Sequence, residues 1–417
     1  MGLSLTLARR FFSASGENGK RASRPAIAIA TAGIAVGLAV MLISVCVVRG
    51  FQAEVAGKLM GFGSHMEVLD YNTFASPESF PVTADTALIN ALENLPEVSK
   101  VQRYAEKIGI LKTEESFAVI ELKGLSPEYD TDFIQKHLVA GKLPQFSDTA
   151  STNRIVLSKQ LATDLQLAVG DRVYAYFFED NVKMRRFTIA AIYQTNMKQF
   201  DRTFVLTDLH TVQRLNSWDE SKASGLEIRI RDFARLAESK ITVEEVVNAL
   251  PDTAGTVRSV LTIRENPRTA GVFNWLTLLD TNVYVILVLI LLVAAFSMIS
   301  GLLILILERT QTIGVLKALG ATNTRLRHTF LYYGAFIVLR GMLFGNILSL
   351  LILWAQDRFG LVHLNPETYY VDTVPVSLEW WPIVLVNVAT LLLTVATLVI
   401  PSFLISRIQP ARAIRFD

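Results

Sequence analysis

TNVYVILVLILLVAAFSMISGLLILIL, residues 281–307, is a run of 27 residues without a charge. About 20 apolar residues suffice for a helix to cross a bilayer, so this stretch predicts a transmembrane helix. It is followed at once by ERTQTIGVLKALGATNTRLR, residues 308–327, whose apolar residues recur at helical spacing up to a glycine. A connection between two spans should be polar and rich in turns. This one instead predicts a short amphipathic helix with an apolar side available for docking.

Three further runs are long enough to cross a membrane. They cover residues 25–48, 329–356 and 380–406, and the second of these is interrupted only by Arg340. The chain of 417 residues is 51% hydrophobic and only 19% charged, which is too apolar for an ordinary soluble protein of this size. We therefore predict an α-helical membrane protein with four transmembrane helices.

The charges outside these runs indicate the topology. Segment 51–280 carries 25 Lys and Arg against 31 Asp and Glu, whereas both terminal tails and the 308–328 loop are basic. Basic residues are enriched in cytoplasmic loops, so we expect both termini to be cytoplasmic and the large acidic segment to lie outside. The expected layout is a cytoplasmic tail with an interfacial helix (1–24), a first transmembrane helix (25–50), an outer domain with stalk ends (51–280), a second transmembrane helix (281–307), a cytoplasmic loop (308–328), a third transmembrane helix (329–356), an outer loop (357–379), a fourth transmembrane helix (380–406) and a cytoplasmic tail (407–417).

The outer segment predicts an α+β domain. Runs rich in β-branched and aromatic residues indicate strands, and they occur at 65–71, 116–125, 172–178, 187–193 and 225–230. Helical patterns occur at 84–95, 158–167, 209–215 and 243–250, and turns are expected at 170–171 and 179–181. Helices and strands alternate without a regular βαβ rhythm.

Motifs of catalysis and metal binding are missing. The chain has no HExxH and no GxSxG, its five histidines lack metal-ligand spacing, and Cys46 is its single cysteine. GENGKR, residues 16–21, has too few residues between its glycines for a phosphate loop and places Arg21 where a serine or threonine should bind magnesium. We expect a non-catalytic protein without a metal or cofactor of its own and without a nucleic-acid partner, so any ATPase must be a separate chain.

Small residues and one charge mark the predicted membrane helices. Gly33 and Gly37 in the first helix, and Gly341 and Gly345 in the third, have the small-xxx-small spacing that lets helix backbones approach closely. A charge at the depth of Arg340 costs about 2.5–3.5 kcal/mol on insertion scales. Arg340 is therefore either a polar contact that changes during transport, a buried structural pair, or a side chain that reaches an interface.

Four stretches together resemble the type VII ABC transporter permeases, the superfamily of MacB, FtsX and LolC/LolE. They are IATAGIAVGLAVMLISVCVVRGFQAEVAGKLMGFGSHMEV (29–68), the 308–327 segment, YYVDTVPV (369–376) and IPSFLISRIQPARAIRFD (400–417). The layout of one span, a large outer domain and three spans is also that of this superfamily. The Gly50-Phe51-Gln52 junction and the 369–376 loop resemble the LolC/LolE branch in particular.

The resemblance implies a permease of the bacterial inner membrane that extracts lipoproteins and passes them to a periplasmic chaperone for the outer membrane. It implies a second permease copy, identical or related, and two copies of an ABC ATPase subunit that binds Mg-ATP. The residues implied to couple to the ATPase are Glu308, Arg309, Ile313, Gly314, Val315, Leu316, Lys317, Leu319 and Gly320, with Asn323 expected to cap the next helix. The residues implied to line a substrate cavity between the permeases are Met41, Val45, Val48, Arg49, Phe51, Tyr284, Leu287 and Leu291.

Two other functions within the superfamily stay open. One is an FtsX-like regulator of a cell-wall hydrolase, although an outer domain of 230 residues is long for it. The other is a MacB-like efflux permease, although such proteins commonly carry a fused ATPase. The predicted hairpin at 177–187 is short and lacks the proline of the LolC hairpin that holds the chaperone, and in this it resembles LolE. Arg49 stands where the family usually has asparagine, and we expect it near lipid headgroups or an acidic substrate linker.

Overall fold

The computed structural model describes residues 23–75, 79–179, 181–250 and 255–407, which form two compact units. The membrane unit comprises Met1–Ala53, Leu276–His363 and Thr373–Asp417, and the α+β unit comprises Glu54–Trp275 and Leu364–Asp372. The expected interfacial helix of the N-terminal tail and the C-terminal tail from residue 408 lie outside the described residues.

The described residues contain four helical segments that are long and apolar enough to cross a membrane, as the sequence predicts. They are α2 (Ser23–Phe62), α9 (Ala270–Glu308), α11 (Asn323–Phe359) and a last segment made of α13 (Trp380–Thr397), α14 (Val399–Ser402) and α15 (Leu404–Arg407). The helices α2 and α9 extend beyond the predicted spans. In α2, Phe51, Val55, Leu59 and Phe62 are all buried and follow one another at three- or four-residue spacing, which keeps the helix amphipathic past the apolar run.

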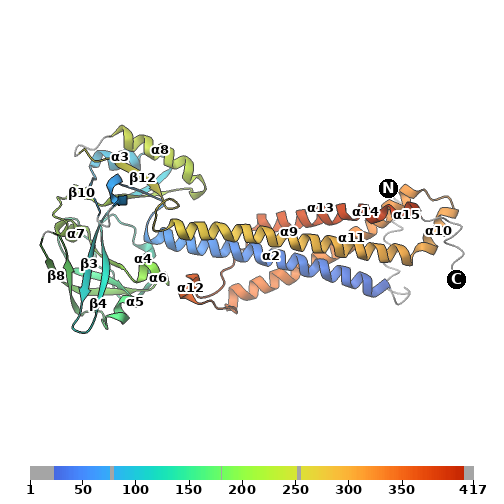
Figure 1. The fold of residues 1–417 in the computed structure, drawn as a ribbon, viewed down its shortest axis with the longest axis horizontal. Coiled ribbons are helices and arrows are strands. Elements are labelled where there is room, and N and C mark those ends of the chain that lie inside the picture. The colour runs from blue at the N-terminus through green and yellow to red at the C-terminus, as the bar shows by residue number, and fades with distance from the viewer. Residues whose placement is uncertain (1–22, 76–78, 180, 251–254, 408–417) are drawn as a thin grey trace. The chain divides into compact units, whose positions relative to one another are not determined.

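Glycines bring α2 against both of its neighbours in the membrane unit, where Figure 1 shows α2, α9 and α11 side by side. Gly33 and Gly37 lie against Ser297 and Ile290 of α9. A Cβ on Gly345 of α11 would lie only 2.7 Å from the carbonyl oxygen of Ala35 in α2. The predicted small-xxx-small packing is therefore confirmed for both helices, and α2 is the central helix of this contact.

Gly345→Ala should separate α2 from α11 and destabilise the membrane unit. The added methyl cannot stay 2.7 Å from a backbone oxygen, so a helix must move, and overpacking of this kind costs about 1–3 kcal/mol. Gly57→Ala in α2 adds the same atom where no heavy atom lies within 4 Å, and it should be neutral or slightly stabilising. The thermal stability of both variants in detergent, measured against wild type, checks this. Equal stability of the two variants would contradict the packing described here.

Two polar features mark α11 within the membrane unit. Asn346 and Asn387 of α13 exchange side-chain hydrogen bonds of 2.7 and 3.0 Å, which ties α11 to α13. Arg340 is exposed on α11 with its guanidinium 5.7 Å from the ring centre of Phe344, and no acidic side chain of the described residues forms an ion pair with it. Three interpretations of Arg340 were left open above. One of them, a buried structural ion pair, is not found among the described residues.

The α+β unit is built on a mixed sheet that has ten strands among the described residues. Its order is β12-β1-β11-β3-β4-β9-β6-β8-β5, and β7 pairs with both β3 and β8. The bounds are β1 Met66–Asp70, β3 Val98–Lys112, β4 Phe117–Leu125, β5 Leu138–Gly141, β6 Arg154–Ser158, β7 Arg172–Phe177, β8 Lys183–Tyr193, β9 Phe204–Asp208, β11 Gly225–Ile230 and β12 Arg258–Thr262. Because of the double pairing of β7, the strands β3, β4, β9, β6, β8 and β7 form a closed ring around an apolar core.

Helices and a small second sheet complete the unit. Strands β2 (Val82–Thr83) and β10 (Lys222–Ala223) pair with each other. The helical segments are η1 Tyr71–Ala75, α3 Thr86–Glu93, α4 Asp132–Lys136, α5 Lys159–Asp164, α6 Lys198–Asp201, α7 Leu209–Leu215, η2 Phe233–Arg235 and α8 Leu236–Ala249. The α+β class, the five predicted strands and the four predicted helices are confirmed. Most ends shift by a few residues, but α8 begins at Leu236 and not at the predicted residue 243. The sequence reasoning missed β3, the longest strand, together with β5, β6, β9 and β12 of the large sheet and both strands of the small sheet.

Candidate functional site

The connection after α9 forms the short helix that the sequence predicts. Helix α10 (Thr310–Ala318) buries Ile313 and Gly314 against the core of the membrane unit, where Ile313 is only 1% exposed. Val315, Ala318 and Leu319 lie on the exposed side, with Leu319 79% exposed. Leu316 packs partly against the core, and Glu308 is exposed where α9 ends. The helix thus presents a small apolar surface, which we call the α10 stripe (Val315, Ala318 and Leu319).

The end of α10 is built from a glycine and a threonine. Gly320 adopts a left-handed conformation (φ +90°) in which a residue with a Cβ would be strained, so it ends the helix as expected. The next helix, α11, is capped by Thr322, whose hydroxyl accepts a hydrogen bond from the Arg325 amide. The expectation that Asn323 provides this cap is wrong, because Asn323 is already the first residue of α11. Threonine and asparagine are both favourable N-cap residues. The sequence alone therefore could not show which of the two neighbours, Thr322 or Asn323, caps α11.

Two cations hold α10 and the start of α11 to the end of the last span. The ammonium of Lys317 donates to the carbonyl oxygen of Ile405 at 2.7 Å, and the guanidinium of Arg327 stacks on the ring of Phe403 at 3.8 Å from its centre. A cation at the carboxyl end of a helix such as α15 is electrostatically favourable. Lys317 therefore fixes the position of α10 in the described chain instead of standing free on its surface. Arg309 precedes α10 as its cap residue and is half-buried.

Of the residues expected to line a substrate cavity, some are buried in the structure and others are exposed. Met41 and Phe51 are buried, and Val45, Leu287 and Leu291 pack against the core of the membrane unit. Val48 is half-buried, while Arg49 and Tyr284 are exposed. The helices α2 and α9 also expose apolar residues that were not singled out from the sequence, among them Ile29, Val36, Val40, Val285, Ile286, Val288, Leu289, Leu292, Val293 and Phe296.

The connection between α11 and α13 contributes residues to each of the two units. In the membrane unit, Gly50 lies so close to Pro375 that a Cβ would be 2.7 Å from its carbonyl oxygen, and the Ser377 amide donates to Cys46. In the α+β unit, which includes α12 (Pro366–Tyr369), the ammonium of Lys58 donates to the carbonyl oxygen of Tyr370 at 2.7 Å. The 369–376 stretch therefore includes a contact with the carboxyl-terminal part of α2.

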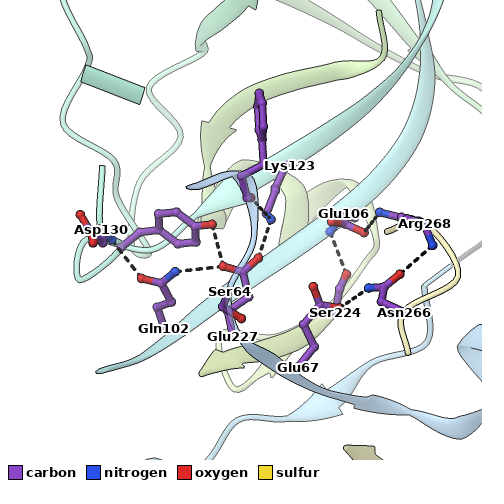
Figure 2. A network of polar contacts seen from close by, with 12 residues as sticks. Ser64, Glu67, Gln102, Glu106, Lys123, Asp130, Ser224, Glu227, Asn266 and Arg268 are labelled. Atoms are coloured by element: carbon purple, nitrogen blue, oxygen red, sulfur yellow. Dashed lines mark hydrogen bonds and ion pairs between the residues drawn. The ribbon is translucent and has the colours of Figure 1, made fainter. Parts of the chain in front are cut away.

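A buried polar network in the α+β unit was not predicted from the sequence, and Figure 2 shows it. Its centre is Glu227 of β11, which is fully buried. The carboxylate accepts hydrogen bonds from the Lys123 ammonium at 2.5 Å, the Tyr129 hydroxyl at 2.6 Å and the Gln102 amide at 2.9 Å. Burial alone would lower the pKa of Lys123, but the negative charge of Glu227 holds that pKa above its usual value.

The network also reaches the carboxyl-terminal end of α2 and the residues just before α9. Lys123 donates a second hydrogen bond, of 3.2 Å, to the carbonyl oxygen of Phe62, the last residue of α2. Just before α9 begins, Arg268 forms ion pairs with Glu106 of β3 at 3.3 Å and Glu121 of β4 at 2.7 Å. Burial and the charge of Glu106 raise the pKa of Glu121 to about 8. Strands β3 and β4 are thus tied to the end of α2 and to the start of α9 by charged hydrogen bonds.

Glu67 of β1 forms no ion pair with a cation of the described residues. It stands directly opposite Glu227 in the β1–β11 register, and the hydrogen bond of its carboxylate comes from the neutral Asn266 amide at 3.0 Å. Burial first, and then the negative charge of Glu227, raise the pKa of Glu67 to about 7. The folded protein therefore holds a carboxyl group that is half protonated near neutral pH.

The stability of the α+β unit should fall as the pH rises from about 4.5 to about 7. In this window the unfolded chain loses the Glu67 proton, whose usual pKa is 4.5, while the folded state keeps it until its pKa of about 7. The slope for one such group is at most about 1.4 kcal/mol per pH unit. Glu67→Gln should flatten this part of the curve. Urea unfolding of wild type and variant at pH 5, 6, 7 and 8 measures it, and parallel curves would show that Glu67 does not titrate in this range.

Two family models match different parts of the chain. The model of the MacB-like periplasmic core domain matches residues 27–252, more than half of the chain. The model of the FtsX-like permease C-terminal region matches residues 284–410, which include α10. The chain belongs to the MacB/FtsX permease superfamily.

Within this superfamily, several curated relatives are named as lipoprotein-releasing proteins. The "Lipoprotein-releasing system transmembrane protein LolC" of Neisseria meningitidis is 24% identical over 93% of this chain and 94% of its own length. LolC of Xylella fastidiosa is 22% identical over 92% of both chains, and LolE of Haemophilus influenzae is 20% identical over the same shares. The resemblance to the LolC/LolE branch is confirmed, and this permease matches those relatives nearly from end to end.

The superfamily assignment fits the chemistry of the site. Permeases of the LolC/LolE family are non-catalytic subunits of ABC transporters. In the described residues, no group of three or more His, Cys, Asp or Glu side chains is arranged to hold a metal ion. What this permease offers instead is an exposed apolar stripe on α10 and a charged network at the helix ends.

Proposed function

We propose that the protein is the permease subunit of an ABC transporter that extracts lipoproteins from the inner membrane for a periplasmic chaperone and the outer membrane. The observation that carries this proposal is the match to LolC and LolE relatives over more than nine-tenths of both chains. The match includes the α+β unit and the α10 region together, so it covers the parts that distinguish such a permease from a general membrane anchor.

Depletion of the protein tests this function. Lipoproteins that normally reach the outer membrane should accumulate in the inner membrane. Density-gradient separation of the two membranes measures this. Re-expression of the intact chain should reverse the accumulation. Undisturbed lipoprotein sorting, combined with a changed activity of a cell-wall hydrolase or a loss of drug or toxin export, would favour the FtsX-like or the MacB-like function.

The energy for extraction is supplied, in this proposal, by a separate ATPase with two copies that bind Mg-ATP. The supporting feature is the α10 stripe, because an amphipathic helix offers spaced apolar anchors to a groove on a partner. Of the residues predicted to couple, Val315 and Leu319 are available on this surface. Ile313, Gly314 and Lys317 hold α10 in place from the other side, and Gly320 ends the helix. In this proposal, these four residues hold α10 so that the α10 stripe stays exposed to the ATPase.

The substrate would lie between this permease and a second copy, identical or related. Exposed apolar residues of α2 and α9 support this part of the proposal, because Val36, Val40 and Phe296 are 55%, 41% and 68% exposed. Tyr284 and Arg49 belong to the same exposed set. With the termini and α10 in the cytoplasm, Arg49 would stand at the outer mouth of α2, where its cation can meet lipid headgroups or an acidic substrate linker.

A further inference from the structure

A cavity of about 370 Å³ lies in the α+β unit where the charged network meets the ends of the long helices. One wall is the polar face of the sheet, with Glu67, Tyr104, Glu106 and Lys123. Apolar side chains, among them Leu59, Phe62, Phe200, Phe204, Leu261 and Ile263, line the rest. Cavities of roughly 300–1,000 Å³ with an apolar lining and a few polar groups are the usual form of small-molecule sites in proteins.

The cations of this wall are already paired. Lys123 lies against Glu227, and Arg268 lies between Glu106 and Glu121. Four carboxyl groups, Glu67 included, therefore share two cations. Like charges directly opposite each other in a sheet are destabilising, and Glu67 faces Glu227 in this way. Above its pKa of about 7, Glu67 therefore brings a negative charge to the cavity wall, and it forms no ion pair with a cation of the described residues.

Tyr104 provides a second polar group at the cavity wall. It is only 4% exposed, and its ring centre lies 4.7 Å from the Lys123 ammonium. Burial, followed by the negative charge of Glu67, raises the pKa of Tyr104 well above its usual value, so the hydroxyl keeps its proton and its oxygen can accept. This hydroxyl oxygen can therefore serve as an acceptor for a ligand in the cavity.

We propose that this cavity binds a small amphiphile consisting of a protonated primary amine on an apolar body. The ammonium lies beside the Glu67 carboxylate, with one N–H donated to that carboxylate and another to the Tyr104 hydroxyl oxygen. The apolar body lies against Phe62, Phe200 and Phe204. An ammonium carries three donors and no acceptor, which matches two acceptors and a surplus negative charge. An anionic head would instead meet the carboxylate of Glu67.

The site goes beyond lipoprotein release, because neither the substrate path nor the α10 stripe uses these residues. Phe62 ends α2, and Thr269, which also lines the cavity, directly precedes α9. A bound amine therefore contacts the ends of both long helices at once. Its binding would restrain their movement relative to the sheet, so the ligand acts as a regulator of the permease and not as its cargo.

Equilibrium dialysis of radiolabelled hexan-1-amine against the full chain in lipid nanodiscs tests the site. Subtracting empty nanodiscs removes partitioning into lipid. At pH 8 we expect saturable binding of one amine per chain, weakened at least about tenfold by Glu67→Gln, a loss typical of one removed charged partner. Tyr104→Phe should weaken it several-fold, and hexan-1-ol should bind at least about tenfold less tightly than the amine. Glu238→Gln, a change on the exposed side of α8, should leave binding unchanged.

Three results would overturn the proposal. They are no saturable binding of hexan-1-amine above the nanodisc background, equal affinity of wild type and Glu67→Gln, and equal affinity for the amine and the alcohol, which would indicate an apolar cavity only. Tyr104→Phe is nearly isosteric and keeps the test decisive if Glu67→Gln does not fold. None of these measurements involves lipoproteins, so their failure is distinguishable from failure of the proposed function.

Discussion

Leu319→Asp should abolish ATP-driven lipoprotein release while leaving the permease folded. Leu319 is 79% exposed, so an aspartate there costs the fold little. In the proposed complex the same side chain is an apolar anchor in a groove of the ATPase. Loss of such an anchor costs about 2–4 kcal/mol of binding, which is roughly a 30- to 1,000-fold weaker association. Co-purification of the ATPase and lipoprotein release into a chaperone-containing buffer measure the two effects.

Two other variants separate docking from folding. Leu361→Asp changes a leucine of similar exposure in the outer loop, and it should leave ATPase binding and release intact. Ile313→Asp places a charge in the core of the membrane unit, where no partner compensates it, and it should yield little folded protein. Wild-type release from Leu319→Asp would falsify the docking role of the α10 stripe. Loss of release with full ATPase binding would move the role of Leu319 from docking to the later transmission of movement.

Lys123→Met should destabilise the α+β unit by about 3–5 kcal/mol, the usual cost of leaving one member of a buried ion pair alone. Glu227 would remain fully buried without its cation, opposite Glu67, and the Phe62 carbonyl would lose its donor. The double variant Lys123→Met with Glu227→Gln should regain most of the loss, because it removes the stranded charge. The double variant would still lack the hydrogen bond that the Lys123 ammonium donates to the Phe62 carbonyl oxygen at the end of α2.

Hydrogen exchange of peptides from β4 and β11, followed by mass spectrometry during urea unfolding, gives the stability of this region directly. Arg235→Met is the surface control, because its ion pair with Glu238 is exposed, and we expect no measurable change. A Lys123→Met variant as stable as wild type would contradict the role of Lys123 as the cation that compensates the buried Glu227.

The strand β3 shows why part of the fold was not predictable from the sequence. Residues 98–112 include Lys100, Arg103, Glu106 and Lys107, and these charges hide the apolar alternation that marks an ordinary half-buried strand. In the folded protein Glu106 meets Arg268, a residue distant in the chain, so its burial is compensated only after folding. The signal that could have indicated the network is a glutamate within each otherwise largely apolar strand, namely Glu67, Glu121 and Glu227.

The sequence by itself determined the four membrane helices, the α+β class and the amphipathic helix after α9. Length, charge and apolar spacing act locally, and water or lipid enforces them wherever the segment lies in the fold. The tertiary structure decided which residues of these elements are available. Helical spacing indicates that α10 has an apolar side, but Ile313 is buried and Leu319 exposed because the core of the membrane unit covers one side and Lys317 binds the end of α15. Such contacts join residues far apart in the chain, and no local pattern records them.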